Sequence, residues 1–202
     1  DLLIERGYGE ILNMWAYSRI DTVRDQNHLD LLKAAGINWL ALGIESAEQR
    51  VRMEATKGRF QDIDIKKTVG MIEASGIEVI ANYLFGLPGD NLETMQATLD
   101  FSLDLCTAAW NGYSVMALPG SELHHEARQQ GYALPSSYSG YSFYSYDTLP
   151  LPTKELTPVQ ILAFRDKAFM EYHTDPRFLN KLHRSFGRVA VDNIQDLTRL
   201  KL

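Results

Sequence analysis

EVIANYLFGLPGD, residues 78–90, is the stretch that decides the fold. Its first part, Glu78–Phe85, is dominated by apolar residues and predicts a strand buried inside a sheet. A turn that contains glycine and proline follows. Asn91–Cys106 then places its apolar residues on one stripe, as an amphipathic helix does. A buried strand, a turn and a helix in this order form one unit of a parallel α/β fold.

The same succession occurs on both sides of this stretch. The junctions AAGI at residues 34–37 and ASGI at residues 74–77 each join a helix to a strand, about one βα unit apart. We therefore expect four parallel strands, covered by helices and joined by right-handed crossovers. The remaining strands are predicted at Asn13–Ser18, Asn38–Ile44 and Gly112–Leu118, and the remaining helices at Asn27–Ala35, Asp62–Ser75 and Ser121–Gln130.

The composition changes after residue 134. Residues 135–152 (PSSYSGYSFYSYDTLPLP) are rich in tyrosine, serine and proline and have no helical period. We predict a linker loop here, with tyrosines that pack onto the α/β part rather than line a substrate pocket. Thr157, Pro158 and Gln160 are the N-cap, N1 and N3 residues of a predicted helix, which Pro176 ends. The predicted division is an α/β part (1–134), a linker loop (135–152) and an α-helical C-terminal extension (153–202).

Charge and composition exclude several classes of protein. A formal net charge of −6 argues against a large nucleic-acid surface. No apolar run is long enough for a membrane-spanning helix, and one cysteine cannot form an internal disulfide, so a reducing cytoplasm is the default. The chain begins at Asp1, within what reads as a helix end, so we expect a piece of a longer protein.

Polar residues and glycines stand at the predicted ends of the strands. Ligands of parallel α/β folds bind at the carboxyl ends of the strands. Polar side chains from separate strand ends can converge there on one polar ligand, and glycines allow the backbone to approach it. The positions are Ser18–Asp21, Glu45–Ser46, Asn82–Asp90 and Pro119–Gly120.

The motifs at these strand ends resemble those of the radical S-adenosylmethionine (radical SAM) superfamily. The resemblance runs from Met14 to Gly131, and it is to the branch with coproporphyrinogen dehydrogenases, methylthiotransferases and cobalamin-dependent radical SAM proteins. It implies a partial (β/α) barrel. The elements are Trp15 with Arg19-Ile20-Asp21, then Leu31–Gly36 (LLKAAG), Gly43–Ser46 (GIES), Lys57, Gly86–Asp90 (GLPGD) and Leu118–Leu123 (LPGSEL).

The resemblance implies roles for individual residues. Glu45 and Asn82 match positions near the SAM ribose, and Lys57 matches a basic position that contacts the SAM carboxylate. A diol needs hydrogen-bond acceptors and a carboxylate needs a cation, so these residue types suit the ligand. The turn from Gly86 to Gly89 would bring backbone close to the cofactor, and Ser18 or Arg19 lies where relatives approach the methionine amino group.

The chain departs from the family in one respect. The family holds a [4Fe–4S] cluster with a CxxxCxxC motif, whereas Cys106 is the single cysteine here and cannot supply three thiolates. We therefore expect a fragment whose parent cleaves SAM reductively to a 5′-deoxyadenosyl radical that acts on a small organic substrate. A cobalamin-binding domain in the parent is a further expectation, and so is self-association of the fragment through an open sheet edge.

Each candidate residue also has a structural interpretation. Glu45 can neighbour a helix N-cap, Asn82 can be satisfied by backbone groups, and GLPGD can be a tight turn. Arg19 can form an ion pair with Asp21. Two other functions stay open: a barrel remnant that binds a partner protein, and a cluster-free lyase or aldolase that uses Lys57 or Glu45 as its base.

Overall fold

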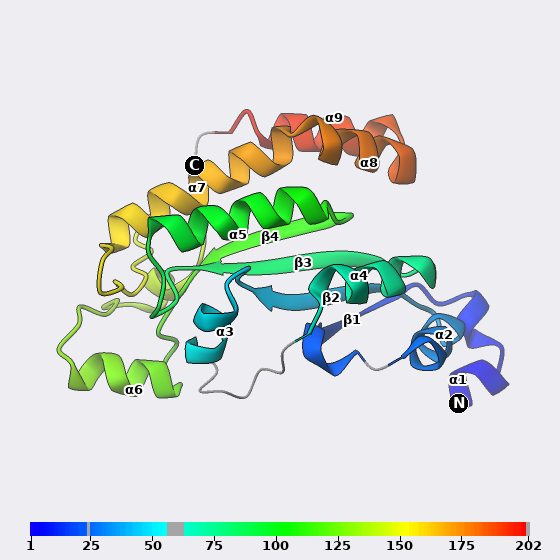
Figure 1. The fold of residues 1–202 in the computed structure, drawn as a ribbon, viewed down its shortest axis with the longest axis horizontal. Helices are drawn as coiled ribbons and strands as arrows, with labels where there is room; N and C mark the ends of the chain where they lie inside the picture. The colour runs from blue at the N-terminus through cyan, green and yellow to red at the C-terminus, as the bar shows by residue number, and fades with distance from the viewer. Residues whose placement is uncertain (24, 56–62, 201–202) are drawn as a thin grey trace.

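Four parallel strands form the centre of the protein (Figure 1), and the computed structural model describes residues 1–23, 25–55 and 63–200. The strands lie in the order β1-β2-β3-β4, and each is parallel to its neighbours. The predicted α/β class is confirmed, and β1 and β4 are the edges of the described sheet. β1 spans Met14–Arg19, β2 Ile37–Glu45, β3 Glu78–Phe85 and β4 Ala109–Ser114.

The fourth strand lies earlier in the chain than the predicted Gly112–Leu118. Ala109 pairs with Ile80, and the ladder ends where Ser114 pairs with Phe85. Beyond Ser114 the backbone N–H of Val115 still donates to the Phe85 carbonyl at 3.0 Å, and the Val115 carbonyl accepts a hydrogen bond from the backbone N–H of Leu151. The chain then turns over the strand ends. Residues 115–118 are apolar because they line that end, which is why hydrophobicity alone misplaced the strand.

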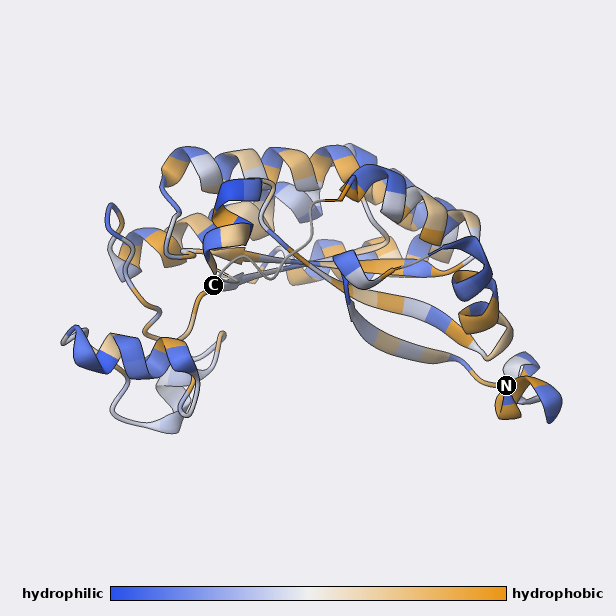
Figure 2. Ribbon diagram, turned by 60° about the horizontal axis from the view of Figure 1, so that its bottom comes forward, coloured by the Kyte–Doolittle hydropathy of each residue, from blue (hydrophilic) through white to orange (hydrophobic). Residues whose placement is uncertain are grey.

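Helices pack along one face of the sheet (Figure 2). Alternate strand residues, among them Val79, Ala81 and Tyr83 of β3, form one core with the apolar stripes of these helices. The capping box of Thr157 and Gln160 is formed as predicted. The helices on this face are α2 (Gln26–Ala34), α4 (Ile65–Ala74), α5 (Leu92–Leu105) and α7 (Pro158–Thr174).

The C-terminal helices join the same core. α8 (Pro176–Phe186) begins at the predicted proline, and α9 (Arg188–Leu197) follows it. Phe186 stacks on Trp39 of β2 with the ring centroids 5.4 Å apart, and Lys181 pairs with Glu73 of α4 at 2.6 Å. The remaining described elements are α1 (Leu2–Glu5), η1 (Tyr8–Glu10), η2 (Ile20–Thr22), α3 (Gln49–Ala55), α6 (Glu122–Gln129) and η3 (Tyr138–Tyr141).

The opposite face of the sheet carries a row of aligned residues from all four strands. Register pairs Arg19 with Gly43, Gly43 with Asn82, and Asn82 with Asn111. Since paired residues of parallel strands point to the same side, these four share the face that is turned away from the main core. The functional candidates lie on this face and at its carboxyl end.

Candidate functional site

A cavity of about 420 Å³ lies at the carboxyl ends of the strands. Each of the four strands, or the segment directly after it, contributes residues to the cavity wall. The cavity therefore lies at the strand ends, where the sequence analysis predicts that a ligand binds. Its volume falls within the range of pockets that hold small molecules. Among the residues that line it are Arg19, Glu45, Arg52, Leu84, Met116 and Phe143.

Glu45 occupies an irregular position at the end of β2. The register between β2 and β3 shifts between Gly43 and Glu45, and Glu45 has a φ of 69°, in the left-handed region. A residue with a side chain is strained there by about 1–3 kcal/mol, and such strain is concentrated at functional sites. The side chain folds back over Gly43: a Cβ atom on Gly43 would lie only 2.5 Å from Glu45 Oε1.

The environment of Glu45 changes its acidity. Burial raises the pKa of its carboxyl to about 7, although the positive charge of Arg19 lowers it. No hydrogen bond to this carboxyl is found within the described ranges, and the carboxyl borders the cavity. Glu45 can therefore accept hydrogen bonds from a ligand and can exchange a proton near neutral pH.

Arg19 and Asp21 form the predicted ion pair. Arg19 Nη2 lies 2.5 Å from Asp21 Oδ2, with the Asp21 side chain buried and the Arg19 side chain 47% exposed. The pairing holds the guanidinium at the cavity wall, where its charge also acts on Glu45. The structural role of Arg19 and a role in binding are therefore compatible.

Arg52 is a cavity residue that the sequence analysis did not select. Its side chain is buried, and Nη1 donates to the carbonyl groups of Ser46 at 2.6 Å and Ala47 at 2.8 Å. It fixes the loop after β2 and adds a second cation to the cavity wall. The local sequence contains no signal for it, because Gln49–Ala55 mixes charged and apolar residues and the burial of Arg52 depends on its bonds to the loop after β2.

Asn82 lies on the same face of the sheet as Glu45, opposite the Gly43 that Glu45 covers. Its amide nitrogen donates to the carbonyls of Leu42 at 3.1 Å and Ile80 at 3.3 Å, and its amide oxygen accepts from Asn111 Nδ2 at 2.9 Å. The structural interpretation of Asn82 is therefore supported by its contacts. A contact with the ribose stays a prediction.

The GLPGD turn is held together by Asp90. Its buried carboxylate accepts the backbone N–H groups of Gly86 at 3.1 Å and Leu87 at 2.9 Å. Gly86, with φ of 85°, has room only for a hydrogen, because a Cβ would lie 2.8 Å from Ile161 of α7. A Cβ on Gly89 would lie 2.5 Å from Glu54 of α3. Both glycines lie directly against side chains of this protein, so the turn packs on α3 and α7 and positions these helices at the site.

The Tyr-rich segment closes one side of the cavity through Phe143. The Phe143 ring packs on Tyr113 of β4 with centroids 4.8 Å apart, and Arg165 of α7 donates to the Phe143 carbonyl. The prediction that the tyrosines of this segment pack inward is wrong for Tyr138, Tyr144 and Tyr146, which are 70% exposed or more. Serine hydroxyls bound to Asp147 shape this loop instead.

Two further predictions concern residues away from this cavity. Lys57 lies outside the described residues, so its predicted contact with a carboxylate stays a prediction. Cys106 ends α5 in the left-handed conformation and packs half-buried against the core, where burial raises the pKa of its thiol. Within the described ranges, no three His, Cys, Asp or Glu residues gather into a metal site. No described helix has the length and apolarity to cross a membrane.

Two curated methyltransferases are similar in sequence to parts of this chain. No protein-family model matches the chain. It is 28% identical over 120 residues to cytidylyl-2-hydroxyethylphosphonate methyltransferase of Streptomyces wedmorensis, covering 55% of this chain and 22% of that protein. It is 26% identical over 190 residues to an uncharacterised methyltransferase of Pyrococcus horikoshii, covering 92% of this chain and 39% of that protein. The chain thus spans well under half of these relatives.

A solved structure shows the same fold. The radical SAM methyltransferase TsrM of Kitasatospora setae, described with cobalamin and a [4Fe–4S] cluster bound, matches 84% of this chain and 31% of its own. The TM-score is 0.57 and the sequence identity 20%. The predicted resemblance to radical SAM enzymes, among them cobalamin-dependent ones, is confirmed at the level of the fold.

Proposed function

We propose, from the confirmed resemblance to the radical SAM superfamily, that the strand-end cavity is a SAM-binding site of a radical SAM enzyme. The observation that supports this most directly is the Glu45 carboxyl. It is held in a strained conformation, borders the cavity, and has acceptor capacity that no hydrogen bond uses within the described part of the chain. A ribose diol offers two O–H donors to such a carboxylate.

The rest of the cavity suits the remaining parts of SAM. The guanidinium groups of Arg19 and Arg52 stand at the wall, and their positive charges favour an anionic group such as a carboxylate. Leu84, Met116 and Phe143 provide apolar and aromatic surface for a purine. Lys57, which the resemblance assigns to the SAM carboxylate, is retained in this proposal as a further cation.

The [4Fe–4S] cluster of the solved relative does not fit the residues of this chain. Three thiolates are needed for a [4Fe–4S] cluster that leaves one iron open, and Cys106 is the single cysteine. We therefore assign the cluster to another part of the parent enzyme, and a cobalamin-binding domain, if the parent has one, stays a separate expectation. SAM bound here would be the source of a 5′-deoxyadenosyl radical, with methionine released and the electron supplied by the reduced cluster of the parent enzyme, and the residues of this chain would bind and orient the SAM.

S-adenosylhomocysteine (SAH), which shares the ribose, purine and carboxylate of SAM, tests the site by isothermal titration calorimetry on the chain. Glu45→Gln keeps the volume of the side chain but loses the carboxylate, and we expect SAH binding to weaken by about 1–3 kcal/mol. Glu93→Gln, on the exposed start of α5, is the matched control and should leave binding unchanged. Equal affinity of the two variants would contradict the assignment of Glu45.

The cluster-free lyase or aldolase remains a second candidate because of one observation. A pKa of about 7 is what a general base at neutral pH requires. The two functions differ in the ligand: SAH should bind to a SAM site, whereas a lyase site should bind keto acids or aldehydes. Binding of pyruvate with no binding of SAH would favour the lyase.

A further inference from the structure

Glu45 is the central residue of a very tight turn at the end of β2. The backbone N–H of Ser46 donates to the carbonyl of Ile44 at 2.9 Å, and Glu45 between them has a φ of 69°. A hydrogen bond that closes three residues with a positive φ in the middle makes a γ-turn of the rare, strained kind. Strained backbone persists only where the surrounding structure over-determines it. Contacts outside this turn must therefore hold Glu45 in place.

The residues after the turn are anchored by Thr98, which lies on the buried side of α5. Its Oγ1 accepts the backbone N–H of Ala47 at 3.1 Å and lies 3.1 Å from Ser46 Oγ. Thr98 Oγ1 also lies 2.9 Å from the carbonyl of Thr94, one turn earlier in α5. Ser46 and Thr98 are 0% and 1% exposed, so water cannot replace these bonds.

The direction of each hydrogen bond follows from the number of protons. A hydroxyl has one proton to donate and a carbonyl can only accept, so the Thr98 hydroxyl donates to the Thr94 carbonyl. Ser46 must then donate to Thr98, and Ser46 Oγ accepts the backbone N–H of Glu48 at 3.2 Å. Thr98 is thus the shared acceptor of two donors from the loop after β2. Without its oxygen, the Ser46 hydroxyl and the Ala47 N–H would both lose this acceptor.

The hydrogen bonds continue along α5 to the GLPGD turn. Thr94 Oγ1 lies 2.7 Å from Asp90 Oδ1. The other oxygen of Asp90 accepts the N–H groups of Gly86 and Leu87. One run of hydrogen bonds therefore joins the loop after β2 to the turn after β3.

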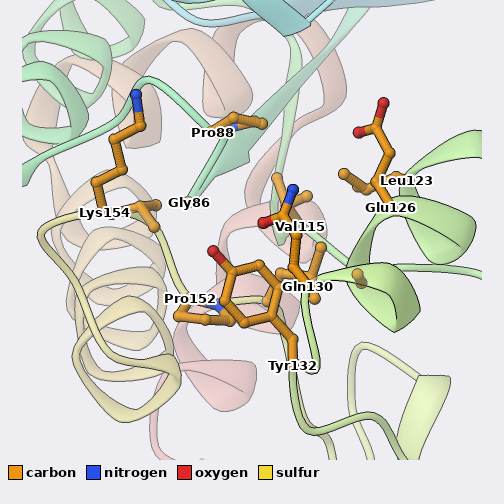
Figure 3. Close-up of a pocket in the computed structure, with 12 residues that line it drawn as sticks. Gly86, Pro88, Val115, Leu123, Glu126, Gln130, Tyr132, Pro152 and Lys154 are labelled. Atoms are coloured by element: carbon orange, nitrogen blue, oxygen red, sulfur yellow. The ribbon is translucent and has the colours of Figure 1, made fainter.

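This turn forms part of the wall of the strand-end cavity. Leu87 lines that cavity and packs with Val51 of α3 and Val115 in a small apolar cluster. The turn also borders a smaller cavity, which Figure 3 shows with Gly86 and Pro88 at its edge. The position of this turn therefore shapes the wall of the strand-end cavity.

We propose that Thr98 is a positioning residue of the strand-end cavity. By holding the loop directly after Glu45, it keeps the Glu45 carboxyl over Gly43, and it ties this loop to the turn after β3. Thr98 is not among the described residues that line the cavity, so it acts through Glu45 rather than on a ligand. Its effect on SAM binding rests on the proposed function, whereas its effect on Glu45 does not.

Three variants of the chain separate this positioning from general support of the fold. Thr98→Val keeps the shape of the side chain but removes the oxygen, and Thr98→Ser keeps the oxygen. Ser102→Ala is the matched control, because Ser102 is equally buried one turn further along α5 and donates to the Leu99 carbonyl of the same helix at 2.8 Å. Circular dichroism and urea unfolding report the fold and the stability of each variant.

The first measurement is the pKa of the Glu45 carboxyl, followed by NMR as the pH changes, and it needs no ligand. Burial raises this pKa to about 7 in the natural chain. Thr98→Val should release the carboxyl toward water, so its pKa should fall toward the usual value of 4.5. Thr98→Ser should restore the raised pKa, and Ser102→Ala should leave it unchanged. Either a natural chain whose Glu45 titrates near 4.5, or a folded Thr98→Val variant that keeps the raised pKa, would overturn the proposal.

The second measurement is SAH binding by calorimetry. Thr98→Val should weaken it about tenfold or more, Thr98→Ser should restore it, and Ser102→Ala should not change it. A natural chain that binds no SAH would refute the SAM site, while the pKa of Glu45 would still decide the role of Thr98. Equal SAH affinity of the natural chain and of Thr98→Val would refute the positioning role and leave the SAM site standing.

A milder variant covers the case in which Thr98→Val does not fold. Ser46→Ala removes one of the two donors to Thr98 and leaves the Ala47 N–H bond in place. It should shift the pKa of Glu45 in the same direction as Thr98→Val. An unchanged pKa in folded Ser46→Ala would overturn the proposal.

Discussion

The carboxyl of Glu45 lies directly over Gly43, so closely that a Cβ atom on Gly43 would come within 2.5 Å of Oε1. The two residues are separated by Ile44, whose side chain is buried in the core on the other side of the sheet. The irregular register at this point turns the Glu45 side chain across the open face of the sheet. Glycine at position 43 is therefore part of the site, because it makes room for the carboxyl.

Gly43→Ala should displace the Glu45 side chain while leaving the strand in place. We expect SAH binding to fall by about 1–3 kcal/mol, as for Glu45→Gln, since both changes remove the same acceptor. Gly70→Ala is the control, because Gly70 lies in α4 with open space around its Cα. That variant should be more stable by about 0.5–1 kcal/mol and should bind SAH normally. Calorimetry and urea unfolding report the two effects separately.

The raised pKa of Glu45 predicts a pH-dependent stability. The folded protein holds this proton up to a pKa of about 7, whereas the unfolded chain loses it near 4.5. The folded state therefore binds more protons between these values, and its stability falls as the pH rises from about 4.5 to 7. Glu45→Gln removes this loss, so the variant should gain roughly 2–3 kcal/mol relative to the natural chain between pH 5 and pH 8.

Urea unfolding of the natural chain and of Glu45→Gln between pH 5 and pH 8 measures the difference between their free energies of unfolding. Other titrating groups contribute equally to both proteins, so their effects cancel in this difference. A constant difference between the two unfolding free energies would show that Glu45 titrates normally. The environment described for the carboxyl would then be wrong.

The hydrogen bond between Asn82 and Asn111 predicts that the two residues are coupled in stability. Asn82→Ala should destabilise the fold by about 1–3 kcal/mol, because it removes the partner of Asn111 and two bonds to backbone carbonyls. Asn111→Ala should have a smaller effect, and the double variant should be less destabilised than the sum of the two.

The same variants test the predicted ribose contact. If Asn82 contacts the cofactor, Asn82→Ala should weaken SAH binding by about 1–3 kcal/mol, while Asn111→Ala should weaken it little. Equal losses in both variants would assign Asn82 to the support of the sheet alone.

The edge position of β1 predicts self-association of the chain. β1 pairs only with β2 in the described sheet, and Trp15 and Tyr17 beside this edge are 57% and 74% exposed. Open edges pair readily with other chains, and a lysine on the edge prevents it. Tyr17→Lys should therefore make the chain monomeric in sedimentation velocity runs at increasing concentration. Tyr146→Lys, a change on a fully exposed loop tyrosine, should not, and a natural chain that stays monomeric would contradict the prediction.

Local pattern was sufficient for most elements of this fold, with α3 and β4 as exceptions. The apolar runs of β2 and β3, the cap at Thr157 and the breaks at glycines and Pro176 act over a few residues, so they are readable from the chain. α3 was not predicted, because Gln49–Ala55 is short and its apolar residues are few. β4 was misplaced, because apolar residues serve equally in a strand and in the wall of a cavity.

The sequence by itself determined that Glu45, Asn82 and the turn from Gly86 come to one end of a parallel sheet, because successive parallel strands all end at the same edge. Only the tertiary structure decided which of these side chains remain available to a ligand. The side chain of Asn82 is hydrogen-bonded to Leu42, Ile80 and Asn111. The turn is packed against α3 and α7, whereas the Glu45 carboxyl faces the cavity. The physical reason is that hydrogen-bond satisfaction and burial depend on residues far away in the sequence.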